Sequence, residues 1–376
     1  MRPLFAALLL AAGVSGPVAA QRIWKSTLYP YLYYSSVDGF WGALHIGRYC
    51  PIGYVERPEP NFAAVAFDLS ASTQGSYSFT ADAQAPAWWT GWRVGLTVTA
   101  ARANRLGYYG VGNAAAFSQD SVTPTQPYFY RVSRSTAALR ATVQRRLIGP
   151  VRLLAGAGLG HTSFRRLPGA TVFAQDVAAG VVDSAPFNDA TARAGLVADT
   201  RDNEIDPHRG IFLEGLYAAG RGYTRTTLSA RAYLNPTEKL TIAARVAGEN
   251  MGGDPAVAAQ MVMESSERPF IAVGGLRSLR GYYDGRFTGR GKLLGGLEAR
   301  YGLLWAPSVL ELKIVGFYDV GRVFGPGEDF TVTTTGLHAS GGAEVAVRLL
   351  RNTIVLVGYG RGSEGGQFLV GSSWSY

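Results

Sequence analysis

The sequence predicts an all-β protein: a closed antiparallel transmembrane β-barrel of about sixteen strands, with a long extracellular loop folded into the lumen. Apolar and polar residues alternate with a period of two from end to end, and no long segment shows helical periodicity. Long and short connections also alternate along the chain. The composition agrees, since 47% of the residues are hydrophobic and 48 are glycine, well above the usual glycine share of roughly 7%.

The first twenty residues, MRPLFAALLLAAGVSGPVAA, have the features of a secretory signal peptide. Arg2 gives an early positive charge, an apolar stretch follows, and Ala19-Ala20 precedes a predicted cleavage site at Gln21. A membrane anchor is the alternative, but the apolar core is short and is broken by glycine and proline. We therefore expect a signal peptide at 1–20 and one barrel domain at 21–376.

The period of two is clear in KLTIAARVAGEN (239–250), where one face has Leu240, Ile242, Ala244 and Val246 and the other has Thr241, Arg245 and Glu249. Such strands, apolar on one side and polar or charged on the other, are typical of transmembrane barrels. The predicted strands lie near residues 29–34, 40–49, 61–70, 75–84, 89–102, 128–146, 151–165, 192–202, 210–221, 225–235, 238–249, 291–303, 310–323, 337–349, 352–361 and 366–376.

The connections differ in length on the two predicted rims. Long connections follow odd-numbered strands, and tight turns follow most even-numbered ones, with residues 50–60 as an exception. This arrangement is typical of bacterial outer-membrane barrels with both termini in the periplasm. We therefore expect an outer-membrane location in a Gram-negative bacterium, with membrane lipids and lipopolysaccharide around the barrel. Closure is expected because an open edge in hydrocarbon leaves backbone groups unpaired.

The longest predicted connection, 250–290, contains GGLRSLRGYYDGRF (274–287), which concentrates arginines, glycines and aromatic rings. Its SLRGYYDGRF portion resembles the loop motif of the BamA/TamA family, the bacterial surface antigen superfamily of outer-membrane proteins. The resemblance implies that Arg280 is the tip arginine, Gly281 its hinge and Tyr282 the ring of a loop that folds back into the barrel.

Two later strands resemble the same family. KIVGFYDVGRVFG (313–325) is similar to its Phe-x-Asp-x-Gly strand motif, here Phe317, Asp319 and Gly321, and Glu298 falls where the family has a second inward acid. By parity, both acids also belong to the polar faces of their strands. A guanidinium binds carboxylates with a planar two-point fit, so these acids are expected to hold the loop tip in the lumen.

Two further segments carry the resemblance. TRDNEIDPHRG (200–210) is similar to a strand-turn-strand signature of the family, and GSSWSY at 371–376 is similar to the signal read by the barrel assembly machinery, through Gly371, Trp374 and Tyr376. Trp374 and Tyr376 share the apolar parity of the last predicted strand, so we expect them at the membrane interface.

The resemblance implies a protein of outer-membrane protein assembly, insertion or polypeptide translocation, with unfolded polypeptide as a possible partner. It is expected to be a version without periplasmic POTRA domains, because few residues separate the predicted cleavage site from the first strand. A passive diffusion channel for small solutes and a barrel with a purely structural role are alternatives that the sequence leaves open.

Other classes of function have little support in the sequence. The histidines, including His208, show no metal-ligand spacing, and the one cysteine, Cys50, is expected to be buried or lipid-facing. No set of serine, aspartate and histidine suggests an enzyme. We expect no catalytic residues, no metal and no cofactor. Nucleic acid is not an expected partner, because the chain has no basic run.

Overall fold

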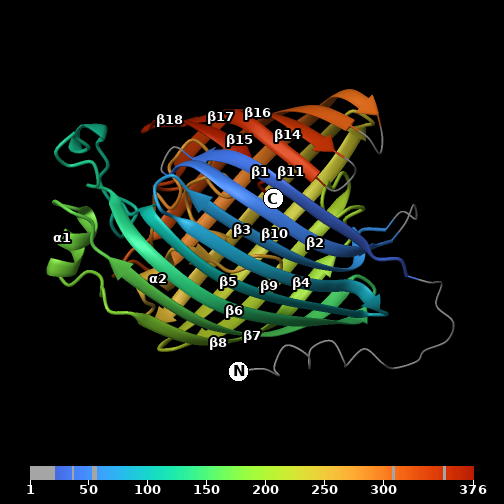
Figure 1. Ribbon diagram of the computed structural model, residues 1–376, viewed down its shortest axis with the longest axis horizontal. Coiled ribbons are helices and arrows are strands. Elements are labelled where there is room, and N and C mark those ends of the chain that lie inside the picture. Colours follow the sequence, from blue (N-terminus) through green and yellow to red (C-terminus); the bar gives the residue numbers. More distant parts are fainter. Residues whose placement is uncertain (1–21, 36–37, 53–56, 307–309, 350–352) are drawn as a thin grey trace.

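The computed structural model describes residues 22–35, 38–52, 57–306, 310–349 and 353–376. The predicted signal peptide therefore lies outside the described residues. Within them, sixteen strands form one antiparallel sheet in which each strand pairs with its neighbours in the chain (Figure 1). The strands are β1 (Lys25–Ser35), β2 (Gly39–Pro51), β3 (Asn61–Ser72), β4 (Tyr77–Trp89), β5 (Trp92–Gly107), β6 (Arg131–Ile148), β7 (Val151–Arg165), β8 (Phe187–Asp199), β9 (Gly210–Gly220), β10 (Tyr223–Thr237), β11 (Leu240–Gly253), β14 (Gly291–Ala306), β15 (Leu310–Phe324), β16 (His338–Leu349), β17 (Thr353–Gly362) and β18 (Gly365–Gly371).

The other elements lie in the connections. A short hairpin of β12 (Val262–Met263) and β13 (Phe270–Ile271) and the one-turn helix α2 (Val257–Gln260) belong to the long connection after β11. Helix α1 (Val172–Ala178) lies between β7 and β8, and the 3₁₀ turn η1 (Gln119–Ser121) between β5 and β6. No helix among the described residues is long and apolar enough to cross a membrane.

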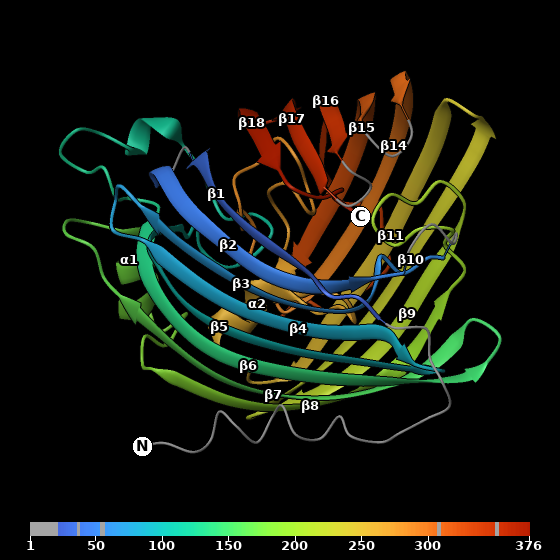
Figure 2. The ribbon, with the colours of Figure 1, turned by 45° about the vertical axis from the view of Figure 1, so that its right-hand side comes forward.

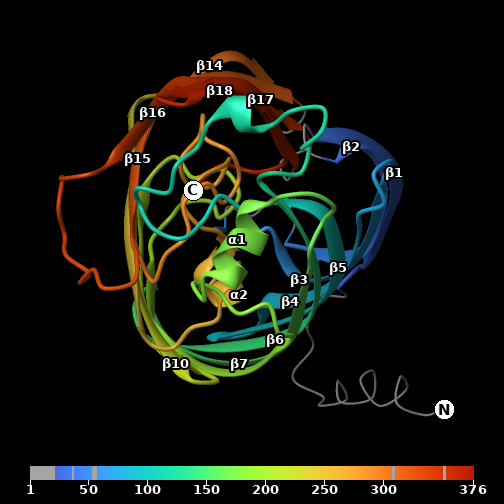
Figure 3. The same ribbon diagram turned by 90° about the vertical axis from the view of Figure 1, so that its left-hand side faces the viewer.

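The sheet curls around a central space, the interior, which contains α2 and much of the long connection (Figures 2 and 3). Its two edge strands are β1 and β18, and among the described residues no hydrogen-bonded ladder joins them. We call this boundary the seam. The prediction of an all-β antiparallel fold with sixteen sheet strands is confirmed.

The period of two separates the faces of the sheet. In β11, Thr241, Arg245 and Glu249 are buried on the inner face, whereas Val246 on the outer face is 62% exposed. Inner charges are paired across strands, as where Lys292 Nζ donates to Glu249 Oε1 at 2.6 Å. An outer face of exposed apolar side chains is stable only in apolar surroundings.

One connection and the end of the last strand differ from the prediction. The strand predicted at 192–202 is β8, which ends at Asp199, and residues 200–209 form a folded turn where a tight one was expected. The last predicted strand, 366–376, ends at Gly371, and residues 372–376 leave the sheet. Cys50 is buried on β2, one of the two positions expected for it.

Candidate functional site

The connection after β11, residues 254–290, is here called the plug loop. Its tip reaches the inner face of β15 and inserts Arg280, which is fully buried. Arg280 Nε and Nη2 donate to the two carboxylate oxygens of Asp319 at 2.7 and 2.9 Å. The guanidinium also lies 3.8 Å from the ring centroid of Phe317. The result is a planar two-point contact that an ammonium group could not make.

Two further carboxylates complete this contact. Arg280 Nη1 donates to Glu298 Oε1 at 2.7 Å and to Glu344 Oε2 at 3.2 Å. Glu298 is shared, because its other oxygen accepts from Arg300 Nε at 2.8 Å. The structure thus brings Arg280 together with both predicted acids and with Glu344, which the sequence analysis missed. Alternation in β16 places Glu344 on the inner face with Ser340, and this parity could have identified it.

The residues after Arg280 fit closely against β17. Gly281 has φ +92°, and a Cβ there would lie 2.7 Å from the backbone nitrogen of Arg361. Both the left-handed backbone and the lack of space require glycine. Tyr282 is buried, and its hydroxyl is 3.0 Å from Ser363 Oγ in the β17–β18 turn.

Apolar packing supports the polar contacts at the tip. Leu279 and Val273 of the plug loop belong to a buried cluster with Leu294 of β14. Gly321 allows this packing, because a Cβ on it would lie 3.0 Å from Val273 Cγ1. Near the C-terminal end of the loop, Arg286 makes a two-point contact with Glu364 at 2.8 and 2.7 Å.

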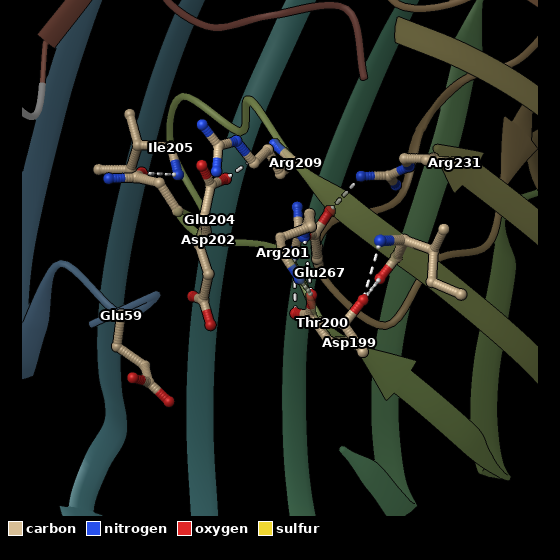
Figure 4. A network of polar contacts seen from close by, with 12 residues as sticks. Glu59, Asp199, Thr200, Arg201, Asp202, Glu204, Ile205, Arg209, Arg231 and Glu267 are labelled. Carbon is tan, nitrogen blue, oxygen red and sulfur yellow. Dashed lines mark hydrogen bonds and ion pairs between the residues drawn. The ribbon is translucent and has the colours of Figure 1, made fainter. Parts of the chain in front are cut away.

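A second contact of the plug loop lies at Glu267, next to β8 and β10 (Figure 4). Arg201, which follows β8, donates to both oxygens of Asp199 at 3.0 Å and to Glu267 Oε1 at 2.8 Å. Arg231 of β10 donates to Glu267 Oε2 at 2.7 Å. Both guanidiniums also contact the ring of Phe212, with their Cζ atoms 4.5 and 4.7 Å from its centroid.

These arginines control the ionisation of Glu267. Enclosure in the interior opposes the charged form, but Arg231 and Arg201 outweigh it and hold the pKa of this carboxyl well below its ordinary value. The contact is therefore an ion pair at neutral pH. The sequence analysis did not identify Glu267, because its two partners come from distant segments.

The turn 200–209 is stiffened by its own side chains. Asp202 Oδ1 accepts from the backbone N–H of His208 at 2.9 Å. Asn203 Oδ1 accepts from the N–H groups of Ile205 and Asp206 at 2.8 and 2.9 Å. Asx side chains that bond nearby backbone in this way stabilise compact turns. The Arg-Asp-Asn pattern noted in the sequence therefore builds the turn and also supplies, through Arg201, its contact with the plug loop.

Asp206 joins this turn to residues 372–376. Its carboxylate accepts from Trp374 Nε1 at 2.9 Å and from Lys313 Nζ at 2.7 Å. Burial would raise the pKa of Asp206, but the Lys313 ammonium and neighbouring cations hold it below its ordinary value. The indole also lies under Arg300, whose Cζ is 4.0 Å from the ring centroid.

The expectation that Trp374 and Tyr376 lie at the membrane interface is therefore wrong. Both are buried in the interior and not on the lipid-facing side. Tyr376 lies under Arg245, 4.5 Å from the ring centroid, and its carbonyl accepts from Arg300 at 3.1 Å. The alternation of residues places them on the outer face only if the strand continues beyond Gly371. The strand ends there, and the two rings pack against buried arginines in the interior. Their predicted part in assembly stays a prediction, as does that of Gly371.

One group of potential metal ligands is present among the described residues. Ligand atoms of Asp206, His208 and Glu311 lie within 4.8 Å of one another. The Lys313 ammonium is among them, 2.7 Å from Asp206, 3.2 Å from His208 and 3.6 Å from Glu311. A protein cation thus occupies the position that a metal ion would need.

A cavity of about 570 Å³ lies between the turn, the inner face of the early strands and residues 372–376. Its lining is rich in arginine, and most of these side chains have acidic partners. Arg93 pairs with Glu204 at 2.6 Å, for example, and Arg140 pairs with Glu264 at 2.7 Å. The arginines of the lining are Arg93, Arg140, Arg152, Arg201, Arg231, Arg268 and Arg277.

A sixteen-stranded antiparallel sheet with an apolar outer face, a charged inner face and an arginine-anchored internal loop defines a class, the outer-membrane β-barrel proteins that contain a plug. The family model described as the Omp85 superfamily domain matches residues 60–350. The chain belongs to the Omp85 superfamily, and the predicted relationship to the BamA/TamA type is confirmed. This membership indicates an outer-membrane protein.

Two solved structures have a similar fold. The crystal structure of BamA from Haemophilus ducreyi lacking POTRA domains 1–3 matches with a TM-score of 0.58 and 12% identity, over 93% of this chain and 70% of that one. CdiB from Escherichia coli matches with a TM-score of 0.57 and 10% identity, over 95% of this chain and 61% of that one. This chain thus spans less than two thirds of that CdiB chain. A search of curated proteins gave no match.

Proposed function

We propose that this protein is an outer-membrane barrel that inserts polypeptides into the outer membrane or passes them across it, with the plug loop as its gate. The observation that carries the proposal is the buried contact of Arg280 with Asp319, Glu298 and Glu344. One side chain holds the tip of a long loop inside the barrel. Breaking that contact would therefore free the tip of the loop.

The two edge strands of the sheet are a reason to propose a polypeptide as the substrate. Unpaired backbone groups in hydrocarbon cost several kcal/mol each, so β1 and β18 need a partner in the membrane. We propose that they pair with each other in a closed barrel at rest. An incoming extended chain could satisfy the same backbone groups by strand addition.

A diffusion channel for small solutes is the second candidate, and the charged cavity favours it. An arginine-rich lining would raise the local concentration of anions. The two candidates differ in the resting state. A gated insertase is closed to ions while the plug loop is in place, whereas a diffusion channel conducts steadily.

Photo-crosslinking at the seam tests the proposal. A photoreactive residue would replace Thr27 on β1 or Val370 on β18 in cells, with Leu228 on the outer face of β10 as the control position. We expect adducts with newly exported polypeptides at the two seam positions and not at Leu228. Equal labelling at all three positions, together with a large steady conductance in planar bilayers, would support the channel instead.

A further inference from the structure

The turn 200–209 contacts two segments that are distant in the sequence. At one end, Arg201 binds Glu267 of the plug loop. At the other end, Asp206 accepts the hydrogen bond of Trp374 Nε1. The proposed function does not use this turn, although its sequence pattern is distinctive.

The contact at Arg201 is built for rigidity. The side chain is only 4% exposed and is held by Asp199 while it reaches Glu267. Since Asp199 is the last residue of β8, the guanidinium is fixed to the wall before it contacts the plug loop. A displacement of Glu267 therefore acts on the start of the turn.

The contact at Asp206 is equally fixed. Asp206 is 1% exposed, and Lys313 Nζ and Arg348 Nε approach it to 2.7 and 3.3 Å from β15 and β16. Trp374 is the one partner of Asp206 described here that belongs to residues 372–376. Its indole N–H thus ties these residues to the turn.

The middle of the turn is attached to β5 and to the segment before β3. Glu204 accepts from Arg93 of β5 at 2.6 and 2.8 Å, and its backbone N–H donates to the carbonyl of Pro58 at 2.9 Å. Together with the internal bonds of Asp202 and Asn203, these contacts make the turn one stiff unit. A stiff unit with a partner at each end transmits displacement between them.

We propose that the turn 200–209 is a clamp that couples the plug loop to residues 372–376, so that release of either one loosens the other. Arg201 and Asp206 are the positioning residues of this clamp. A separate route exists through Arg300, which contacts Glu298 and Tyr376, so the test must separate the two.

The two ends of the clamp can be followed in the purified protein in detergent by how accessible each is to a reagent. Protease cleavage within 254–290 reports on the plug loop. Modification of Ser375→Cys by a polyethylene-glycol maleimide, in a Cys50→Ala background, reports on residues 372–376, because Ser375 is 3% exposed. Neither readout requires polypeptide insertion, so the outcome does not depend on the proposed function.

Arg201→Gln should raise both the cleavage rate and the Ser375→Cys modification rate by about 5-fold or more, the lower end of typical coupling. Arg231→Gln is the matched control. It removes another partner of Glu267 but keeps the Arg201–Glu267 contact that joins the plug loop to the turn, so both rates should rise by less than in Arg201→Gln. Arg201→Lys, which keeps the charge but cannot bridge two carboxylates, should resemble Arg201→Gln if the latter does not fold.

The reverse direction uses Trp374→Phe, which removes the N–H donor to Asp206 and keeps an aromatic ring under Arg300. We expect faster cleavage within 254–290 in this variant, and no further increase when Arg201→Gln is added. Parental cleavage in Trp374→Phe, or modification unaffected by Arg201→Gln and Arg201→Lys, would overturn the coupling. Additive effects in the double variant would assign it to the Arg300 route.

Discussion

A single guanidinium carries most of the polar contact between the plug loop tip and the barrel wall. Arg280 contacts three carboxylates, and its side chain is fully buried. Truncating one partner of a buried ion pair costs about 3–5 kcal/mol, against about 1 or less for a surface pair, because the remaining charge is left uncompensated.

Arg280→Ala should therefore free the loop without unfolding the sheet. We expect faster protease cleavage within 254–290 and a larger, noisier single-channel conductance, with poor rescue by Arg280→Lys. Arg290→Ala is the control, since Arg290 pairs with Asp254, which is 97% exposed. Wild-type cleavage and conductance in Arg280→Ala would show that the tip contact does not hold the loop.

The sequence predicted the centre of this site well, because Arg280, Glu298 and Asp319 lie within motifs and have clear parity. It did not predict Glu344 or Glu267. Each of these acids is an ordinary residue in its own segment and gains its role from arginines far away in the chain. Trp374 shows the opposite failure, since parity is informative only while the strand continues.

The contacts that Glu267 and Asp206 make in the interior require ionised carboxylates, so the stability of these contacts depends on pH. Glu267 and Asp206 both have pKa values below their ordinary ones. Such groups stabilise the folded state above the unfolded pKa, about 4 for these carboxyls, and lose this contribution as the pH falls through the folded value.

We therefore expect the Glu267 contact to persist between pH 8 and 5 and to weaken only below about pH 4, where it should add to the conductance noise of the plug loop. Glu267→Gln should be noisy already at pH 7 and should change less on acidification. Asp254→Asn, which alters an exposed acid of the same loop, should follow the wild type. Equal noise in the wild type and in Glu267→Gln at pH 7 would contradict this assignment.

The strands themselves were predictable, because the period of two was sufficient to place each one. The turn 200–209 was not predictable, because its compact form depends on hydrogen bonds from the backbone to the side chains of Asp202 and Asn203. Such bonds produce no periodic pattern in the sequence. For the same reason the end of β18 could not be located from the sequence.

On the scale of the whole molecule, the outer surface needs a membrane. Leu32, Leu228 and Phe368 are 82%, 63% and 86% exposed on the outer face. We expect the protein to fractionate with the outer membrane and to migrate faster unboiled than boiled on a denaturing gel. Recovery as a soluble periplasmic protein would contradict the fold assignment.

A charge on this surface should be costly according to its depth. Leu228→Arg, well inside β10, should lower the free energy of unfolding by about 2–4 kcal/mol, and Thr224→Arg, at the end of the same strand, by about 0–1. The loss of the fast-migrating form with increasing urea measures both. Equal effects at the two positions would mean that the face is not embedded.

The long-range polar contacts of the interior also constrain the order of folding. The Arg93–Glu204, Arg201–Glu267 and Asp206–Trp374 contacts join residues separated by 111, 66 and 168 positions. Contacts of such long range form late, because the intervening chain must first be ordered. Trp374 can reach Asp206 only after nearly all of the sheet has been added. Its burial is therefore a marker of completed biogenesis, and an intermediate arrested before the last strand would leave the Asp206 carboxylate without its indole donor.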